Sequence, residues 1–172
     1  MQNNPLRRKF FQNAWVVDDL ETAIHRWVDE LGVGPFFVTE YRGVLRDVIY
    51  RGSPGVLDMK VALAQNGPIQ VELIEPISTP SAYRDSVTSG TGFHHMCTWS
   101  EDVSADVAYL ESLGYPAANT AKVRDIEIAY VDTRPLLGCM LEFVTVNTAT
   151  QARFAEIAAA GENWDGADPI RS

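Results

Sequence analysis

The stretch QNAWVVDDLETAIHRWVDELGVGP, residues 12–35, predicts a β-strand followed by an amphipathic helix. An apolar run comes first, and Asp19 then stands where a helix N-cap is expected. After it, apolar residues recur at helical spacing: Leu20, Ile24, Trp27 and Leu31. Gly32 and Gly34 favour the end of this helix. The stretch therefore predicts one β-α unit.

A second stretch, HMCTWSEDVSADVAYLESLGYP (residues 95–116), has the same organisation. Aligning its Asp102 with Asp19 gives an offset of 83 residues, and the same offset places His95 on Gln12. A repeat of this length indicates a duplicated structural unit. The sequence thus predicts one β-α unit used twice, with a metal-capable side chain at the same place in each copy.

Each predicted helix is followed by strand-like segments bounded by turn residues. In the first copy they are residues 35–43, 44–52, 55–67 and 68–77, and in the second 117–123, 126–134 and 138–146. We therefore predict an α+β protein with a first βαβββ module in residues 1–80, a second in 81–147, and a C-terminal helix and tail in 148–172. The Ser-, Thr- and Pro-rich segment 78–92 has the composition of a linker.

Composition excludes several classes of partner. The net charge of −9 disfavours nucleic acid and anionic membrane surfaces, which bind to basic patches. We find neither a signal-peptide pattern nor an apolar run long enough to span a membrane. The two cysteines, Cys97 and Cys139, form no CxxC motif, so neither a disulfide framework nor a thiolate zinc site is expected. These features favour a cytoplasmic protein.

The adjacent histidines of GFHHMCTW, residues 92–99, lie on opposite faces of a predicted strand, so only one can join a shared site. The repeat selects His95, the counterpart of Gln12, and leaves His94 without a role. Glu72 and Glu142 each interrupt an apolar strand, where a carboxylate is costly to bury unless it is paired or bound to a cation. Together the four predict a metal site, although each taken alone is also explained as an ordinary strand residue.

Four motifs in this chain resemble those of the vicinal oxygen chelate superfamily, which includes glyoxalase I, methylmalonyl-CoA epimerase, extradiol dioxygenases and bleomycin-resistance proteins. They are FFQNAWVVDDLETAI (10–24), VELIEP (71–76), GFHHMCTW (92–99) and GCMLEFV (138–144). The last three look closest to the epimerase and glyoxalase I branches. The resemblance implies a curved mixed sheet around a metal cleft, with Gln12, Glu72, His95 and Glu142 as ligands.

The resemblance also implies a chemistry. The expected cofactor is a divalent zinc, cobalt, nickel, manganese or iron ion, with zinc favoured, and the expected activity is isomerase or epimerase chemistry through a metal-bound enolate. Glu142 and Glu72 are the expected proton carriers. A small molecule (an acyl-CoA, 2-oxo or aromatic compound) is the expected substrate, and a homodimer the expected assembly. Basic residues available to an acyl-CoA are Arg42, Arg46, Arg51, Lys60 and Lys122.

Three alternatives stay open at the level of sequence. A lyase could use the same stabilised enolate for bond cleavage. A ring-cleaving dioxygenase would need two histidines and one carboxylate around iron, and Gln12 in place of a histidine argues against it. A metal-free binding protein of the same fold would not need the four ligands.

Overall fold

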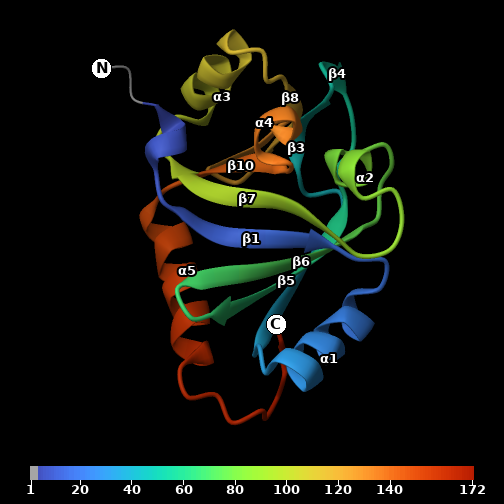
Figure 1. The fold of residues 1–172 in the computed structure, drawn as a ribbon, viewed down its shortest axis with the longest axis vertical. Helices are drawn as coiled ribbons and strands as arrows, with labels where there is room; N and C mark the ends of the chain where they lie inside the picture. The colour runs from blue at the N-terminus through green and yellow to red at the C-terminus, as the bar shows by residue number, and fades with distance from the viewer. Residues whose placement is uncertain (1–3) are drawn as a thin grey trace.

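The computed structural model describes residues 4–172 and contains a single mixed sheet. Its strand order is β11-β2-β5-β6-β1-β7-β10-β9-β8-β3-β4 (Figure 1). The first repeat supplies β1 (Phe10–Val16), β2 (Phe36–Tyr41), β5 (Met59–Asn66) and β6 (Ile69–Pro76). The second supplies β7 (Gly92–Ser100), β8 (Ala117–Val123), β9 (Ile126–Val131) and β10 (Met140–Thr145). The predicted α+β fold with a curved mixed sheet is confirmed.

The two main helices follow the predicted β-α pattern. Helix α1 (Leu20–Leu31) begins after Asp19, whose carboxylate accepts a 2.7 Å hydrogen bond from the Thr22 amide, and ends at Gly32 with φ 67°. Helix α3 (Val103–Ser112) begins after Asp102 in the same way, through the amide of Ala105. Capping of the free amides explains why both aspartates mark helix starts.

The two repeats meet at the centre of the sheet, where β1 pairs antiparallel with β7. On the outer side of each central strand lies a parallel partner, β6 beside β1 and β10 beside β7. The registers match, because Gln12 is opposite Gln70 and His95 is opposite Met140. Glu72 and Glu142 each lie two residues further along, so they occupy equivalent positions in the two halves.

A hairpin made by β3 (Arg46–Tyr50) and β4 (Ser53–Pro54) interrupts the first repeat and has no counterpart in the second. The sequence grouped this segment with the first copy, but β3 pairs with β8 of the second half. Because β2 pairs directly with β5, the chain between them leaves the first half and covers the edge of β8 that would otherwise be unpaired. Residues 42–45 lead from β2 to this hairpin, and residues 55–58 lead from it back to β5.

Short elements complete the chain. Segment 78–92, predicted as a linker, contains the helix α2 (Ala82–Ser86), whose Tyr83 is fully buried. Helix α4 (Arg134–Leu137) precedes β10, η1 (Pro5–Arg7) precedes β1, and helix α5 (Thr148–Gly161) packs against β5. The last strand, β11 (Ile170–Arg171), pairs with β2.

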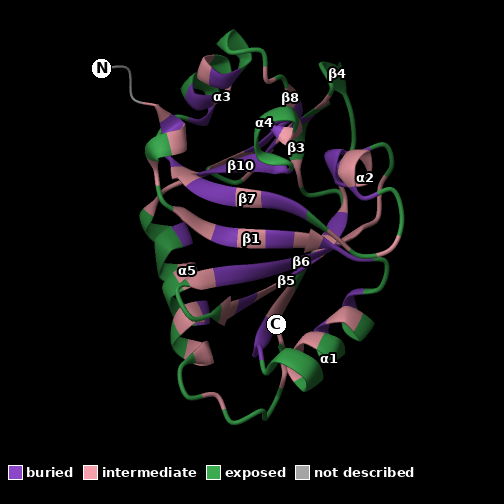
Figure 2. Ribbon diagram, viewed as in Figure 1, coloured by how far each residue is buried: buried purple, intermediate pink, exposed green. Residues whose placement is uncertain are grey.

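Helices α1 and α3 cover one face of the sheet and leave the other face for a site. Helix α1 packs on one half through a cluster that includes Ile24 and Leu73, and α3 packs on the other through Leu110 and Phe143. A third cluster, which includes Met59 and Tyr130, lies on the opposite, inner face. Figure 2 shows the central strands largely buried between these layers. No helix in residues 4–172 is both long and apolar enough to cross a membrane.

Candidate metal centre

Glu72, His95 and Glu142 converge on the inner face from β6, β7 and β10. One ligand atom from each of the three lies within 4.8 Å of the other two. The Nε2 atom of His95 is 3.2 Å from a carboxylate oxygen of Glu72 and 3.1 Å from one of Glu142. All three side chains are buried. The structure thus brings together three of the four residues predicted as ligands, drawn from both repeats.

Two atoms of this cluster lack hydrogen-bond partners among the described residues. They are His95 Nε2 and Glu72 Oε2, and both are buried. Burial by itself lowers the pKa of His95, but the nearby Glu142 and Glu72 carboxylates outweigh it and raise the pKa to about 9. Burial raises the pKa of Glu72. The cluster therefore needs positive charge at its centre, and a divalent metal ion would supply it to both unpartnered atoms at once.

The second histidine of the pair fixes the orientation of the first. His94 Nε2 lies 3.0 Å from the backbone carbonyl of Ala82, which only accepts, so this nitrogen carries the proton. Burial lowers the pKa of His94 to about 3, so the ring is neutral and its Nδ1 is an acceptor. His95 Nδ1, 2.8 Å away, must then be the donor. Because Nδ1 keeps its proton, Nε2 is the nitrogen that can lose its proton and offer a lone pair to a cation held between the two glutamates.

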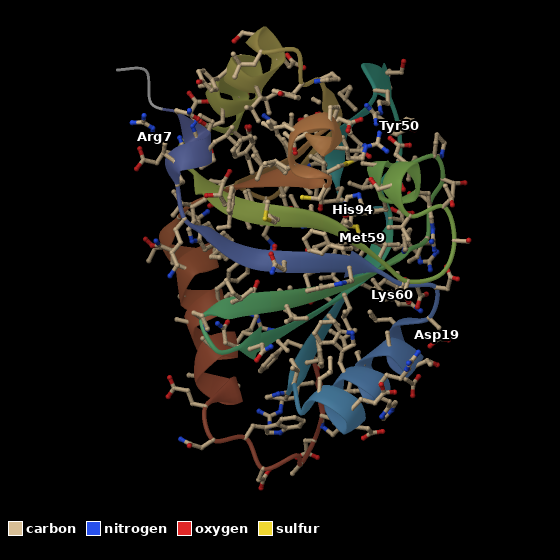
Figure 3. All side chains as sticks on the ribbon, in the orientation of Figure 1. Arg7, Asp19, Tyr50, Met59, Lys60 and His94 are labelled. Atoms are coloured by element: carbon tan, nitrogen blue, oxygen red, sulfur yellow. The ribbon has the colours of Figure 1, made fainter. Side chains whose placement is uncertain are left out.

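His94 is the residue whose role the sequence left unassigned. Its ring also packs edge-on against Tyr83, with centroids 5.2 Å apart, and Tyr83 comes from the segment predicted as a linker. Figure 3 shows His94 among the side chains at the centre of the sheet. Histidine ligands commonly donate their other nitrogen to a polar group that fixes the tautomer. The adjacency of the two histidines was the only signal in the sequence for this contact.

Gln12 is the fourth predicted ligand and lies on the neighbouring strand β1. Its side chain is buried, lines the same cavity as Glu72 and Glu142, and donates a 2.7 Å hydrogen bond from its amide nitrogen to the side chain of Gln70. That bond occupies the nitrogen and leaves the carbonyl oxygen as the atom able to bind a cation. Gln12 therefore lines the same cavity as Glu72 and Glu142 and has an amide oxygen that this bond leaves free.

A cavity of about 130 Å³ adjoins the centre and is lined by both halves of the sheet. Apart from Gln12 and the two glutamates, its polar lining is limited to Tyr41, Tyr130 and Thr150. Its apolar lining consists of Leu45, Met59, Val61, Leu63, Val123, Ile126, Ile128, Val144 and Phe154. We call this cavity the inner chamber. Helix α5 contributes Thr150 and Phe154 to its wall.

A wider cavity of about 590 Å³ shares Tyr41, Val123 and Ile126 with the inner chamber and leads to the surface. We call it the outer cavity; Arg46 and Arg124 also line it. Four of the five basic residues predicted for a substrate tail form ion pairs within the chain: Arg42 with Glu40, Arg51 with Asp85 and Asp132, Lys60 with Glu75, and Lys122 with Glu127. Arg46 instead donates to the backbone carbonyl of Arg124. Tyr50, at the hairpin in Figure 3, bonds to Asp85.

The model of the glyoxalase/bleomycin resistance protein/dioxygenase superfamily matches residues 11–130. The chain belongs to this superfamily. The match spans β1 through β9 and therefore both halves of the sheet. Among curated protein sequences, none matches the chain. The superfamily predicted from the four motifs is confirmed.

Solved structures share the fold at low sequence identity. A methylmalonyl-CoA epimerase in complex with methylmalonyl-CoA and NH4+ aligns with a TM-score of 0.57 and 16% identity, covering 82% of this chain and 96% of that one. A methylmalonyl-CoA epimerase from Mycobacterium tuberculosis gives 0.55 and 17%, covering 88% and 96%. A hypothetical protein from Bacillus halodurans C-125 gives 0.55 and 19%, covering 82% and 96%. These likenesses establish the fold.

Proposed function

We propose that this protein is a metal-dependent isomerase or epimerase that removes a proton from the carbon next to a carbonyl or acyl thioester. The observation that supports it most directly is the unpartnered His95 Nε2, directed at Glu72 and Glu142 on the wall of an apolar cavity. Superfamily membership and the epimerase-like fold are consistent with this activity.

We further propose Gln12, Glu72, His95 and Glu142 as the ligands of one divalent ion. Three oxygen donors and one imidazole suit zinc, cobalt, nickel, manganese or iron, and we favour zinc. Such an ion supplies a Lewis acid that stabilises negative charge developing on substrate oxygens. The protein's part is to hold these ligands on four neighbouring strands and to exclude water from the inner chamber.

Glu72 and Glu142 are the proposed proton carriers. A carboxylate at the wall of the inner chamber can accept a proton from the substrate carbon and return it. Return to the other face of the same carbon is epimerisation, whereas return to the neighbouring carbon is isomerisation. Burial raises the pKa of Glu72, which helps this side chain to keep a proton between the two steps.

The same donor set weighs against a ring-cleaving dioxygenase. Of the three histidines, only His95 faces the cluster, since His94 bonds to it from the side and His25 is exposed on α1. A ferrous site of two histidines and one carboxylate is therefore not formed. A lyase stays compatible with the centre, because bond cleavage can use the same stabilised charge. A metal-free binding role would leave two buried carboxylates with the His95 imidazolium as their only close positive charge among the described residues.

An acyl-CoA is one of the proposed substrates, along with 2-oxo and aromatic compounds. The outer cavity supports it, because Arg46 and Arg124 form no ion pair with described residues and line a cavity that shares Tyr41, Val123 and Ile126 with the inner chamber. The phosphates of such a substrate would find these guanidinium groups available. Homodimerisation and a cytoplasmic location stay predictions from the sequence.

The first test is the metal content of the purified protein, measured by mass spectrometry beside His95→Ala and Glu142→Ala. We expect about one divalent ion per chain in the wild type and a sharp fall in both variants. His25→Ala is the matched control, since it removes an exposed histidine from α1. A wild type that stays free of metal after zinc, cobalt or iron is added back would contradict the proposal.

The second test asks which of the two glutamates carries the proton. Glu72→Gln and Glu142→Gln each keep an oxygen donor but remove the base. Exchange of substrate C–H for solvent deuterium, followed by NMR, should fall about 100-fold or more in the variant that has lost the proton carrier, even when its metal content persists. Exchange that is unchanged in both variants would contradict the assignment of a glutamate as the base.

A further inference from the structure

We infer that the inner chamber accepts an uncharged, apolar substrate head about the size of a benzene ring. This inference rests on the proposed function and narrows its substrate class. It excludes substrates whose reacting end carries a free carboxylate.

The first support is the lining of the inner chamber. None of its lining residues is a lysine, arginine or histidine, and nine of them are apolar. A carboxylate placed here would therefore meet no basic side chain. Tyr41 and Tyr130 could donate hydrogen bonds, but neither carries a positive charge. Arg46 and Arg124 line the outer cavity, so they are available to a tail but do not line the chamber that holds the head.

The second support is the charge of the centre. Glu72 and Glu142 balance a divalent ion, so the filled site is formally neutral before substrate arrives. A substrate carboxylate would add one uncompensated negative charge, and removal of the proton would add another. A neutral head, such as a hydroxyketone, adds none on binding and only one when its proton is removed. Since charge is costly in an apolar cavity, the neutral head is preferred.

The third support is size. A hydrophobic cavity of about 150 Å³ holds a benzene molecule, and the inner chamber measures about 130 Å³. Leu63, Met59 and Phe154 are among the side chains that close it. A phenyl or similarly sized branched group would fill this space, whereas a methyl group would leave most of it empty.

Isothermal titration calorimetry with matched probes tests the inference. We would titrate 2-hydroxyacetophenone (neutral), mandelate (anionic, with the same ring) and hydroxyacetone (neutral, with a methyl group) into Zn2+-loaded and metal-free protein. We expect 2-hydroxyacetophenone to bind at least about tenfold more tightly than either of the other two. Equal or tighter binding of mandelate would overturn the preference for a neutral head, and binding of none of the three would overturn the inference as a whole.

Two pairs of variants test whether the preference for a neutral, ring-sized head arises in the inner chamber. Leu45→Arg adds a cation at the wall and should improve mandelate binding, whereas Leu45→Met should leave the order of the probes unchanged. Leu63→Phe should remove the advantage of the phenyl ring while hydroxyacetone still binds, and Leu63→Met is its control of similar volume. An unchanged order in both test variants would place the probes outside the inner chamber and overturn the assignment.

These results are separate from those that test the proposed function. Calorimetry reports binding even if no C–H exchange occurs, so the head preference can hold while the isomerase proposal fails. Conversely, deuterium exchange with a carboxylate-bearing substrate, together with tight mandelate binding, would support the enzyme and overturn the inferred head.

Discussion

The two halves of the sheet have equivalent strands but hold their proposed ligands differently. The first half supplies Gln12, whose amide bonds to another flexible amide, that of Gln70. The second supplies His95, whose ring bonds to His94, which is fixed in turn by the backbone carbonyl of Ala82. A chain of bonds that ends on the backbone restricts orientation more than one that ends on a side chain. We therefore expect the second half to dominate metal affinity.

The position that corresponds to His94 in the first half is Phe11. Its ring stacks on Trp99 with centroids 4.3 Å apart and also contacts Phe154 of α5. The same place in the repeat thus packs a helix in one half and orients a ligand in the other. The two halves therefore have equivalent positions, and the residues at those positions give them different contacts.

The largest expected effect is the loss of His95, the imidazole ligand. His95→Ala should lower Zn2+ affinity by more than about 100-fold, since even changes to the partners of a ligand typically cost about 10–100-fold. Competition with a chromophoric chelator measures the affinity, and His25→Ala should match the wild type. An affinity within a few-fold of the wild type would show that the cluster does not bind the ion through His95.

The next largest effect tests whether the His94 contact gives the second half its advantage in metal affinity. His94→Phe removes the acceptor for His95 Nδ1 and should lower Zn2+ affinity by about 10–100-fold. His94→Gln, which offers an amide oxygen at that place, should recover part of the loss. Phe11→Leu is the control from the other half and should leave affinity unchanged. A folded His94→Phe protein with wild-type affinity would remove the proposed difference between the halves.

Much of this architecture could be predicted from the sequence, because the repeat and the caps are local. Asp19 and Asp102 marked both main helices. Alternation separated His95 from His94, and the family resemblance implied the common site of Glu72, His95 and Glu142 that the structure brings together. Two features could not be predicted. The pairing of β3 with β8 joins segments far apart in the chain and depends on an open sheet edge. The bond between His94 and His95 depends on side-chain geometry, which strand periodicity does not describe.

A third prediction concerns the hairpin that only the first half contains. Arg51 of the hairpin's turn joins Asp132 of the second half at 2.7 Å, and Arg134 bonds to the same carboxylate. Hydrogen bonds from Arg134, and then from Arg51, hold the pKa of Asp132 well below its usual range, although burial opposes them. Asp132→Asn should therefore lower the free energy of unfolding by about 1–2 kcal/mol at neutral pH.

The pH dependence has a definite sign. A depressed pKa contributes stability that is complete above the unfolded value, about 3.9 for aspartate, and is lost as the pH falls below it. The gap between wild type and Asp132→Asn should thus be constant near neutrality and shrink below about pH 4. Urea unfolding across this range measures it, with the exposed Asp29→Asn as control. A gap that widens on acidification would contradict the pairing.

The smallest expected effect on Zn2+ affinity is that of Gln12, in the first half. Gln12→Ala removes an amide oxygen, which is a weaker ligand for zinc than imidazole, and should lower Zn2+ affinity by less than about tenfold. Gln12→His would place the second half's donor in the first half and should raise affinity if the ring can reach the ion. Gln70→Ala should weaken binding less than Gln12→Ala, because it only frees the amide to turn. If Gln12→Ala cost as much affinity as His95→Ala, the two halves would contribute equally, and the backbone-anchored orientation of His95 would have no energetic consequence.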